Sequence, residues 1–382
     1  MFSPETYARV RLPLEEAETL PAWCYTSAAF YKREVERIFM KVWNFIGRDD
    51  RIPNAGDFFT LTFTGVPVIV ARGADGEVRA FANTCRHRGS MVALGEGNCR
   101  AFKCPYHSWV YGLDGSLLTA PEMQQTRNFD PSAYGLIPIR LERWAGFMFI
   151  NFDEEAESLA SYLGDLPEIL ASYRFEDMVC VRRKEYDLAC NWKIYVENAK
   201  ESYHIGTVHR KTINRYASAK SAGYEVQKTQ GEYVSTFAWH GGSMALLQGD
   251  EGFPPIATLD QKTSGGTTAP LVYPSTYLGC TIDCAWYLEM HPLGPDRMRL
   301  IHGAMFPRPV LSRPDFEEKA ASYYKRWDIT IEEDNGASVL QQQGIASPFA
   351  LPGRFSYREP LVHRIDNWVL DQVLGFERSR LH

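Results

Sequence analysis

Two short segments of this chain each carry one cysteine and one histidine at close spacing. The first is Cys85-Arg86-His87 and the second is Cys104-Pro105-Tyr106-His107, with residues 88–103 between them. Thiolate and imidazole are ligands that zinc and iron–sulfur clusters accept, and each segment is short enough for one loop to present both side chains. Two such loops supply four ligands to one site.

The order of the ligands distinguishes two kinds of site. A structural zinc site usually takes its cysteines from one element and its histidines from another. Here each segment supplies one cysteine and one histidine. This order suits a [2Fe–2S] cluster with one iron on two cysteines and the other on two histidines, which is the ligation of a Rieske centre.

With Tyr106, Ser108 and Trp109, the motif resembles the Rieske domain of ring-hydroxylating oxygenase α subunits. Rieske proteins of respiratory complexes usually add a disulfide between the two loops. No cysteine stands beside His87 or His107 to form one. The resemblance therefore points to the soluble oxygenase type, whose reduction potential is lower.

A second polar group lies at residues 197–209, beside an apolar run that begins at Trp192. It consists of Glu197, Asn198, Glu201, His204 and His209. So many polar side chains are hard to bury unless something binds them. Positions five apart do not share a helix face, so His204 and His209 converge on one ion only if the helix loosens between them. Gly206 lies where such a loosening is tolerated.

Two neutral imidazoles and one carboxylate, with open coordination positions, are typical of non-heme Fe(II) oxygenases. Asp334, within Glu332-Glu333-Asp334-Asn335, is the best candidate for the carboxylate. An exposed acidic helix face is the ordinary alternative for that run, and a lone histidine pair is more often a core or surface pair. The Rieske motif upstream favours iron.

The segment from Asn191 to His209 also resembles the catalytic iron segment of the same family, so the resemblance covers nearly the whole chain. It implies that His204, His209 and Asp334 bind iron and that Asn198 and Glu201 belong to the catalytic group. Glu201 stands where the family has an acidic bridge from the Rieske histidine of one subunit to the iron site of the next. Most ring-dihydroxylating members have Asp there, and Glu occurs in some that act on alkylammonium compounds.

The resemblance implies a terminal oxygenase with a [2Fe–2S] cluster, a mononuclear Fe(II) and O₂ as co-substrate. The reaction that it implies is mono- or dihydroxylation, or oxidative N-demethylation. The substrate would be a quaternary ammonium compound or an aromatic acid. No Gly-x-Gly-x-x-Gly follows a strand pattern, so a separate NAD(P)H-dependent reductase or a ferredoxin must deliver electrons. The family also implies a homotrimer. Two alternatives stay open, namely a Rieske electron carrier with a non-catalytic second domain and a zinc-stabilised β protein.

The elements that position these residues indicate an α+β protein. Turn signals such as Gly65, Gly76 and Gly115 divide residues 58–118 into short strands. We expect an N-terminal helical segment at 1–41, an all-β Rieske domain at 42–155 and a catalytic domain at 156–382, with a curved antiparallel sheet covered by helices of the helix-grip type. The periodicity predicts helices over residues 28–41, 158–170, 191–210, 314–343 and 360–374.

The strands at 237–305 and the iron segment should form the substrate pocket. Its candidate aromatic residues are Tyr203, Phe237, Trp239, Tyr273, Tyr277 and Trp286. Such rings could stack on an aromatic substrate or surround a quaternary ammonium. They are equally what the core of a sheet contains, so the choice stays open.

Composition excludes several other classes. The chain has 382 residues, is 45% apolar and carries 41 basic against 47 acidic residues, for a net charge of −6. This is a globular composition rather than a disordered or collagenous one. No basic run suggests nucleic acid and no apolar run approaches the roughly 20 residues of a membrane span, so we expect a cytoplasmic protein with a small-molecule substrate.

Overall fold

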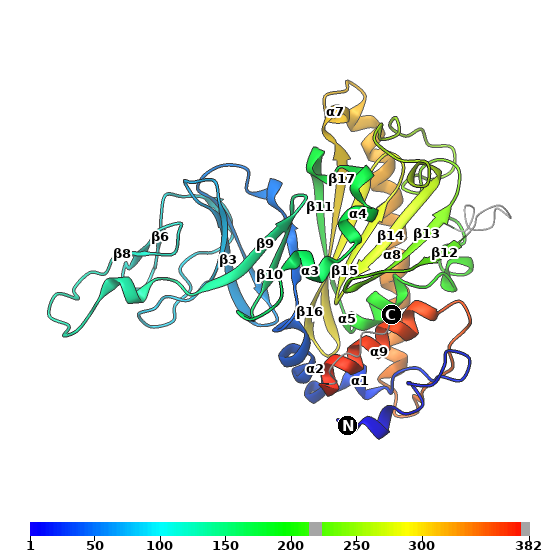
Figure 1. The fold of residues 1–382 in the computed structure, drawn as a ribbon, viewed down its shortest axis with the longest axis horizontal. Helices are drawn as coiled ribbons and strands as arrows, with labels where there is room; N and C mark the ends of the chain where they lie inside the picture. The colour runs from blue at the N-terminus through cyan, green and yellow to red at the C-terminus, as the bar shows by residue number, and fades with distance from the viewer. Residues whose placement is uncertain (214–223, 376–382) are drawn as a thin grey trace. The chain divides into compact units, whose positions relative to one another are not determined.

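The computed structural model describes residues 1–213 and 224–375 (Figure 1). The chain divides into two compact units. One is Lys41–Leu159, and the other combines Met1–Met40 with Ala160–His382. The β-rich segment is therefore an insertion between two parts of one larger unit. In the ranges just given, no helix is both long and apolar enough to cross a membrane.

The smaller unit is built from antiparallel strands. A seven-stranded sheet has the order β1-β10-β9-β4-β3-β2-β5, and a three-stranded sheet has the order β6-β7-β8. The strands are β1 (Asn44–Arg48), β2 (Asp57–Phe63), β3 (Val66–Arg72), β4 (Val78–Ala82), β5 (Glu96–Asn98), β6 (Phe102–Lys103), β7 (Val110–Tyr111), β8 (Leu117–Thr119), β9 (Pro138–Trp144) and β10 (Phe147–Asn151).

Two of its hairpins close through two-residue turns whose sequences explain them. Thr64-Gly65 joins β2 to β3 with φ of 47° and 88°, and Ala145-Gly146 joins β9 to β10 with φ of 47° and 85°. Positive φ at both positions is the type I′ geometry that matches the twist of paired strands, and glycine adopts it without steric cost.

The larger unit contains one antiparallel sheet with the order β11-β17-β16-β15-β14-β13-β12. Its strands are β11 (Met178–Leu188), β12 (Tyr224–Gln227), β13 (Tyr233–Trp239), β14 (Gly266–Val272), β15 (Thr276–Cys280), β16 (Ala285–Gly294) and β17 (Arg297–Pro307). The helices are α1 (Trp23–Thr26), α2 (Ala28–Glu34), α3 (Leu159–Leu163), α4 (Leu166–Ile169), α5 (Trp192–Asn198), α7 (Arg308–Leu311), α8 (Phe316–Ile345) and α9 (Pro360–Leu374).

The long helix α8 packs along one face of this sheet (Figure 1). Trp327 of α8 lies 5.8 Å from Trp286 of β16 and 5.1 Å from His302 of β17, measured between ring centroids. Trp286 pairs with Gly279 of β15, where a Cβ would lie 2.2 Å from the indole ring. We call this side of the sheet the α8 face. The opposite face is contacted by Tyr173, whose hydroxyl donates to the Cys280 carbonyl at 2.9 Å.

The helix predictions are partly confirmed. The helix at 360–374 agrees with α9, and 314–343 agrees with α8 apart from its ends. The helix at 28–41 forms as α2 and continues as a π-helical turn, η2 (Val35–Phe39). The single helix at 158–170 was wrong, because Gly164 adopts φ of 56° and separates α3 from α4. A Cβ there would lie 2.0 Å from the Gln230 carbonyl oxygen.

Candidate metal centres

The two Cys–His segments fold into loops of the same kind. In the loop after β4 and in the loop between β6 and β7, the N–H of Cys85 or Cys104 donates at 2.8 Å to a carbonyl at the far end of its own loop. Each cysteine carbonyl in turn accepts an N–H bond, from Gly89 at 2.9 Å and from Ser108 at 3.1 Å. Both of these donors adopt positive φ. The repeated turn presents a cysteine and a histidine from each loop.

The four side chains separate by type. The thiols of Cys85 and Cys104 are both buried. His87 is exposed and His107 is half-buried, with their ring centroids 4.6 Å apart. In the described part of the chain, the only set of three or more ligand side chains with atoms within 4.8 Å of one another lies elsewhere. The four are therefore too spread for one zinc ion, and they fit a two-iron cluster with its thiolate end inside.

The thiolate end is supported by hydrogen bonds. Burial opposes ionisation of Cys104, but N–H donors from Tyr106 and His107 are among the contacts that give its thiol a lowered pKa. The hydroxyl of Tyr111 accepts the Arg86 N–H at 3.0 Å and lies 3.2 Å from Cys85 Sγ. Since that oxygen accepts from the backbone, its own proton is available to the Cys85 thiolate. Sequence analysis missed Tyr111, because only the pairing of β6 with β7 places it under the first loop.

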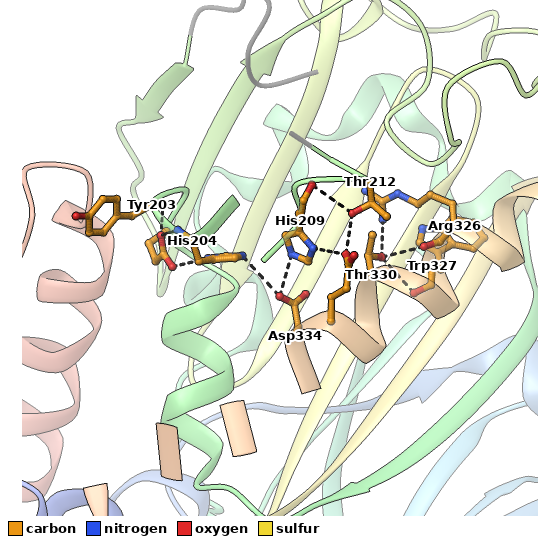
Figure 2. Close-up of polar contacts among 10 residues, drawn as sticks. Tyr203, His204, His209, Thr212, Arg326, Trp327, Thr330 and Asp334 are labelled. Atoms are coloured by element: carbon orange, nitrogen blue, oxygen red, sulfur yellow. Dashed lines mark hydrogen bonds and ion pairs between the residues drawn. The ribbon is translucent and has the colours of Figure 1, made fainter. Parts of the chain in front are cut away.

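The second centre brings together the three predicted iron ligands. Nε2 of His209 lies 2.9 Å from Asp334 Oδ1, and Nε2 of His204 lies 3.6 Å from the same oxygen. One ligand atom from each residue lies within 4.8 Å of the other two. Figure 2 shows both imidazoles turned toward Asp334. His209 is buried and the other two residues are partly buried.

The backbone that positions the histidines differs from the single helix predicted over 191–210. Helix α5 ends at Asn198, and a short 3₁₀ turn, η7 (His204–Gly206), follows. The carboxylate of Glu201 accepts the backbone N–H groups of Tyr203 and His204, the latter at 3.1 Å. A side chain that binds backbone donors in this way competes with the helix. The helix is thus interrupted, as the convergence of His204 and His209 on one ion requires, and the interruption begins before His204.

A carboxylate holds the Nδ1 atom of each histidine. Glu201 Oε1 contacts His204 Nδ1, and Glu333 Oε2 lies 2.7 Å from His209 Nδ1. The Glu333 oxygen also accepts the Thr212 hydroxyl at 2.7 Å. In a neutral imidazole the nitrogen that donates to a carboxylate carries the proton, so the other nitrogen presents a lone pair. Both Nε2 atoms are therefore acceptors that face Asp334.

The donor set consequently fits a metal ion. Asp334 Oδ1 is buried and has no hydrogen bond to any residue in the described ranges, although two ring nitrogens face it. Three lone-pair atoms that converge without a proton between them repel one another unless a cation lies among them. Two imidazoles and one carboxylate are the ligands of non-heme Fe(II) sites with open positions. Burial opposes protonation of His209, but the adjacent carboxylates of Asp334 and Glu333 leave its pKa raised, so the negative charge of this cluster attracts a cation.

Sequence analysis missed Glu333 as a positioning residue. It lies beside Asp334 in α8, and its contact with His209 spans more than a hundred residues of sequence. The acidic run at 332–334 marked the place, but only the packing of α8 shows which carboxylate faces which nitrogen. Asn198, the last residue of α5, is half-buried and forms no hydrogen bond to the three ligands within the described residues.

The predicted pocket aromatics do not lie together. Tyr277 and Trp286 point to the α8 face, because Tyr277 pairs with Leu288 and Gly279 pairs with Trp286. Phe237 pairs with Thr268 and therefore points to the opposite face, as does Trp239. Tyr273 stacks on Trp368 of α9 at 4.6 Å, and Tyr203 is 60% exposed and points away from Asp334 (Figure 2).

Comparisons with known proteins match both units. Residues 42–130 match the Rieske [2Fe-2S] domain model, and residues 175–375 match the model of the ring hydroxylating alpha subunit catalytic domain. The chain is 30% identical over 377 residues to chloroplastic choline monooxygenase of Spinacia oleracea, covering 95% of this chain and 80% of the relative. It is 37% identical over 198 residues to the carnitine monooxygenase oxygenase subunit of Escherichia coli, covering 51% of this chain and 53% of the relative.

Two solved structures share the fold. The first is a quaternary ammonium Rieske monooxygenase described with carnitine oxidation and inter-subunit electron transfer. It has a TM-score of 0.79 and 22% identity, over 93% of this chain and 95% of that one. The second is naphthalene 1,2-dioxygenase from Rhodococcus sp. bound to indole. It has a TM-score of 0.81 and 20% identity, over 99% of this chain and 100% of that one.

Proposed function

Because this chain belongs to the ring-hydroxylating α-subunit family of Rieske oxygenases, we propose that it is a terminal oxygenase that hydroxylates a small organic substrate. The observation that carries the proposal is the convergence of His204, His209 and Asp334 with their lone pairs facing one another. A Rieske electron carrier has no use for this second site, so the alternative of a non-catalytic larger unit is disfavoured.

The proposal assigns a role to each group of residues. Cys85, His87, Cys104 and His107 would hold the [2Fe–2S] cluster, and His204, His209 and Asp334 would hold Fe(II). When bound, the cluster supplies electrons one at a time and the mononuclear iron supplies O₂ reduction and hydroxylation. Glu201 and Glu333 contact the Nδ1 atoms of His204 and His209, which leaves both Nε2 lone pairs available and would let them bind the metal.

The proposal includes two kinds of protein partner. A separate reductase or a ferredoxin would deliver the electrons, since the sequence carries no dinucleotide-binding fingerprint. A homotrimer would allow Glu201 to bridge the cluster of one subunit and the iron site of the next. The Glu201 side chain is 12% exposed, so its carboxylate can still accept a bond from outside its own chain.

For the substrate we propose a small quaternary ammonium compound before an aromatic acid. The choice rests on the relatives, which are named for choline and for carnitine. Glu201 agrees with it, because the family resemblance associates Glu at the bridge with members that act on alkylammonium compounds.

The test is substrate-dependent oxygen incorporation. Protein with both iron sites filled is reduced chemically and mixed with ¹⁸O₂ and each of choline, carnitine, glycine betaine and benzoate. We expect one of them to yield a product, or an aldehyde released on C–N cleavage, that carries ¹⁸O. A protein whose cluster reduces normally, but which oxidises none of these compounds, speaks against the proposed substrate classes. His204→Ala must abolish any product while leaving the cluster spectrum unchanged.

A further inference from the structure

Lys200 is a buried lysine with no carboxylate partner in the described part of the chain, two residues after the end of α5. The residue is 3% exposed, and its Nζ donates to the Ala269 carbonyl of β14 at 2.6 Å. Among residues 1–213 and 224–375, no carboxylate oxygen lies within 4.0 Å of this nitrogen. Burial lowers the pKa of Lys200 to about 7.

A second lysine on the same segment shows what a structural buried lysine looks like in this fold. Lys193 is fully buried within α5, and its Nζ lies 2.6 Å from Glu34 Oε1 and 2.8 Å from Asn191 Oδ1. Its charge is matched by a carboxylate. A buried ammonium with only one neutral acceptor is costly, so Lys200 needs another reason for its position.

Lys200 extends to the α8 face of the sheet. Its Nζ lies 5.8 Å from the centroid of the Tyr277 ring, and Tyr277 points to that face. Burial raises the pKa of the Tyr277 hydroxyl. Two residues of α8 also act on it electrostatically, because Arg326 lowers this pKa and Asp334 raises it. Tyr277 is therefore close to the Lys200 ammonium and within electrostatic range of the iron ligand Asp334.

The two aromatic residues of the predicted pocket that reach this face already have a cation beside them. Lys200 Nζ lies beside Tyr277, and the Arg326 guanidinium lies 5.6 Å from the centroid of Trp286. Arg326 is eight residues before Asp334, about two turns away along α8. A bare ammonium ion placed here would meet like charges. An anionic group would instead pair with the Lys200 ammonium.

We propose that Lys200 recognises a carboxylate on the substrate and so makes this enzyme specific for carboxylate-bearing compounds. This inference rests on the proposed function and narrows it. Zwitterions with a trimethylammonium group and a carboxylate qualify, and so do aromatic acids. Choline, which has a hydroxyl in place of the carboxylate, does not. Lys200 acts as a specificity residue, and the chemistry remains with the iron ligands.

Equilibrium binding tests this without turnover. Anaerobic calorimetry on the protein with both iron sites filled compares two matched pairs, glycine betaine with choline and benzoate with benzamide. A charged hydrogen bond contributes about 1.5–3 kcal/mol, so we expect the carboxylate member of one pair to bind about 10- to 100-fold more tightly. Lys200→Met should remove that preference. Lys262→Met is the control, because Lys262 pairs with Glu225 at 3.0 Å and lies by Phe237 on the opposite face.

Each outcome of the binding experiment either supports or overturns the proposal. Equal binding of both members by the wild-type protein overturns the proposal, as does an unchanged preference in Lys200→Met or no binding of either carboxylate compound. If Lys200→Met fails to fold, as judged by its cluster spectrum, Lys200→Gln replaces it. The affinity ratio between the carboxylate compound and its matched partner is then compared in Lys200→Gln and in the wild type. If the carboxylate compound binds in the expected way but is not oxidised, the proposed function fails while the recognition site stands.

Discussion

Glu333 Oε2 lies 2.7 Å from His209 Nδ1, on the side of the imidazole away from Asp334. Neighbouring carboxylates of α8 therefore meet the two nitrogens of one ring. The two nitrogens of His209 therefore have different roles. Nδ1, which faces Glu333, carries the proton, and Nε2, which faces Asp334, presents a lone pair.

The first prediction concerns this pair. Glu333→Gln should weaken binding of the mononuclear iron about 10- to 100-fold, because the amide no longer holds the Nδ1–H tautomer of His209 as a carboxylate does. Titration of iron into metal-free protein, followed by activity and by iron content, measures the change. Glu332→Gln is the matched control, since Glu332 is exposed on the same turn. Equal affinity in the two variants would show that Glu333 does not support the ligand.

The second prediction concerns Glu201. Glu201→Gln should keep both metal centres but stop electron delivery to the mononuclear site, because the amide lacks the charge of the bridging carboxylate. Rapid mixing of the reduced variant with substrate and O₂ should leave the cluster reduced. Reoxidation and product formation at the wild-type rate would mean that Glu201 only positions His204 and its backbone, as its contacts within this chain already do.

The third prediction concerns the cluster potential. Tyr111→Phe should lower the reduction potential by about 60 mV, because a hydrogen bond to the Cys85 thiolate stabilises the more negative reduced state by about 1.5 kcal/mol. Spectroelectrochemistry measures it. Tyr134→Phe removes a hydroxyl from the same unit that makes no hydrogen bond to a described residue, and it should leave the potential within error. Equal potentials in both variants would contradict the role of Tyr111.

The fourth prediction follows from the pKa of Lys200, which burial lowers to about 7. Between pH 7 and its ordinary pKa the unfolded chain binds this proton and the folded chain does not, so stability rises with pH in that interval. Lys200→Met should therefore be more stable than the wild type near pH 6, by about 5 kcal/mol, with the difference shrinking above pH 7. Denaturant unfolding at several pH values measures this, and a pH-independent difference would contradict it.

What could be predicted from the sequence is the chemistry that short spacings encode. Cys85-x-His87 and Cys104-x-x-His107 specify a mixed-ligand cluster because one loop holds each pair. Hairpin turns could be read from Gly65 and Gly76, since few other residues adopt the required φ.

What could not be predicted depends on long-range packing. The contact of Glu333 with His209 requires the position of α8 relative to η7. Phe237 and Tyr277 looked alike in the sequence, yet strand pairing sends them to opposite faces. The predicted helix over 191–210 failed for a local reason, because Glu201 binds backbone N–H groups that a continuing helix would use.

The central claim is that one chain holds two separate iron centres, and iron counting combined with a single turnover tests it most directly. Purified wild-type protein should contain about three irons per chain, and Asp334→Ala about two, with the same cluster absorbance in both. After chemical reduction, only the wild type should form product when substrate and O₂ are added. Two irons per chain in the wild type, or equal product from Asp334→Ala, would contradict the claim.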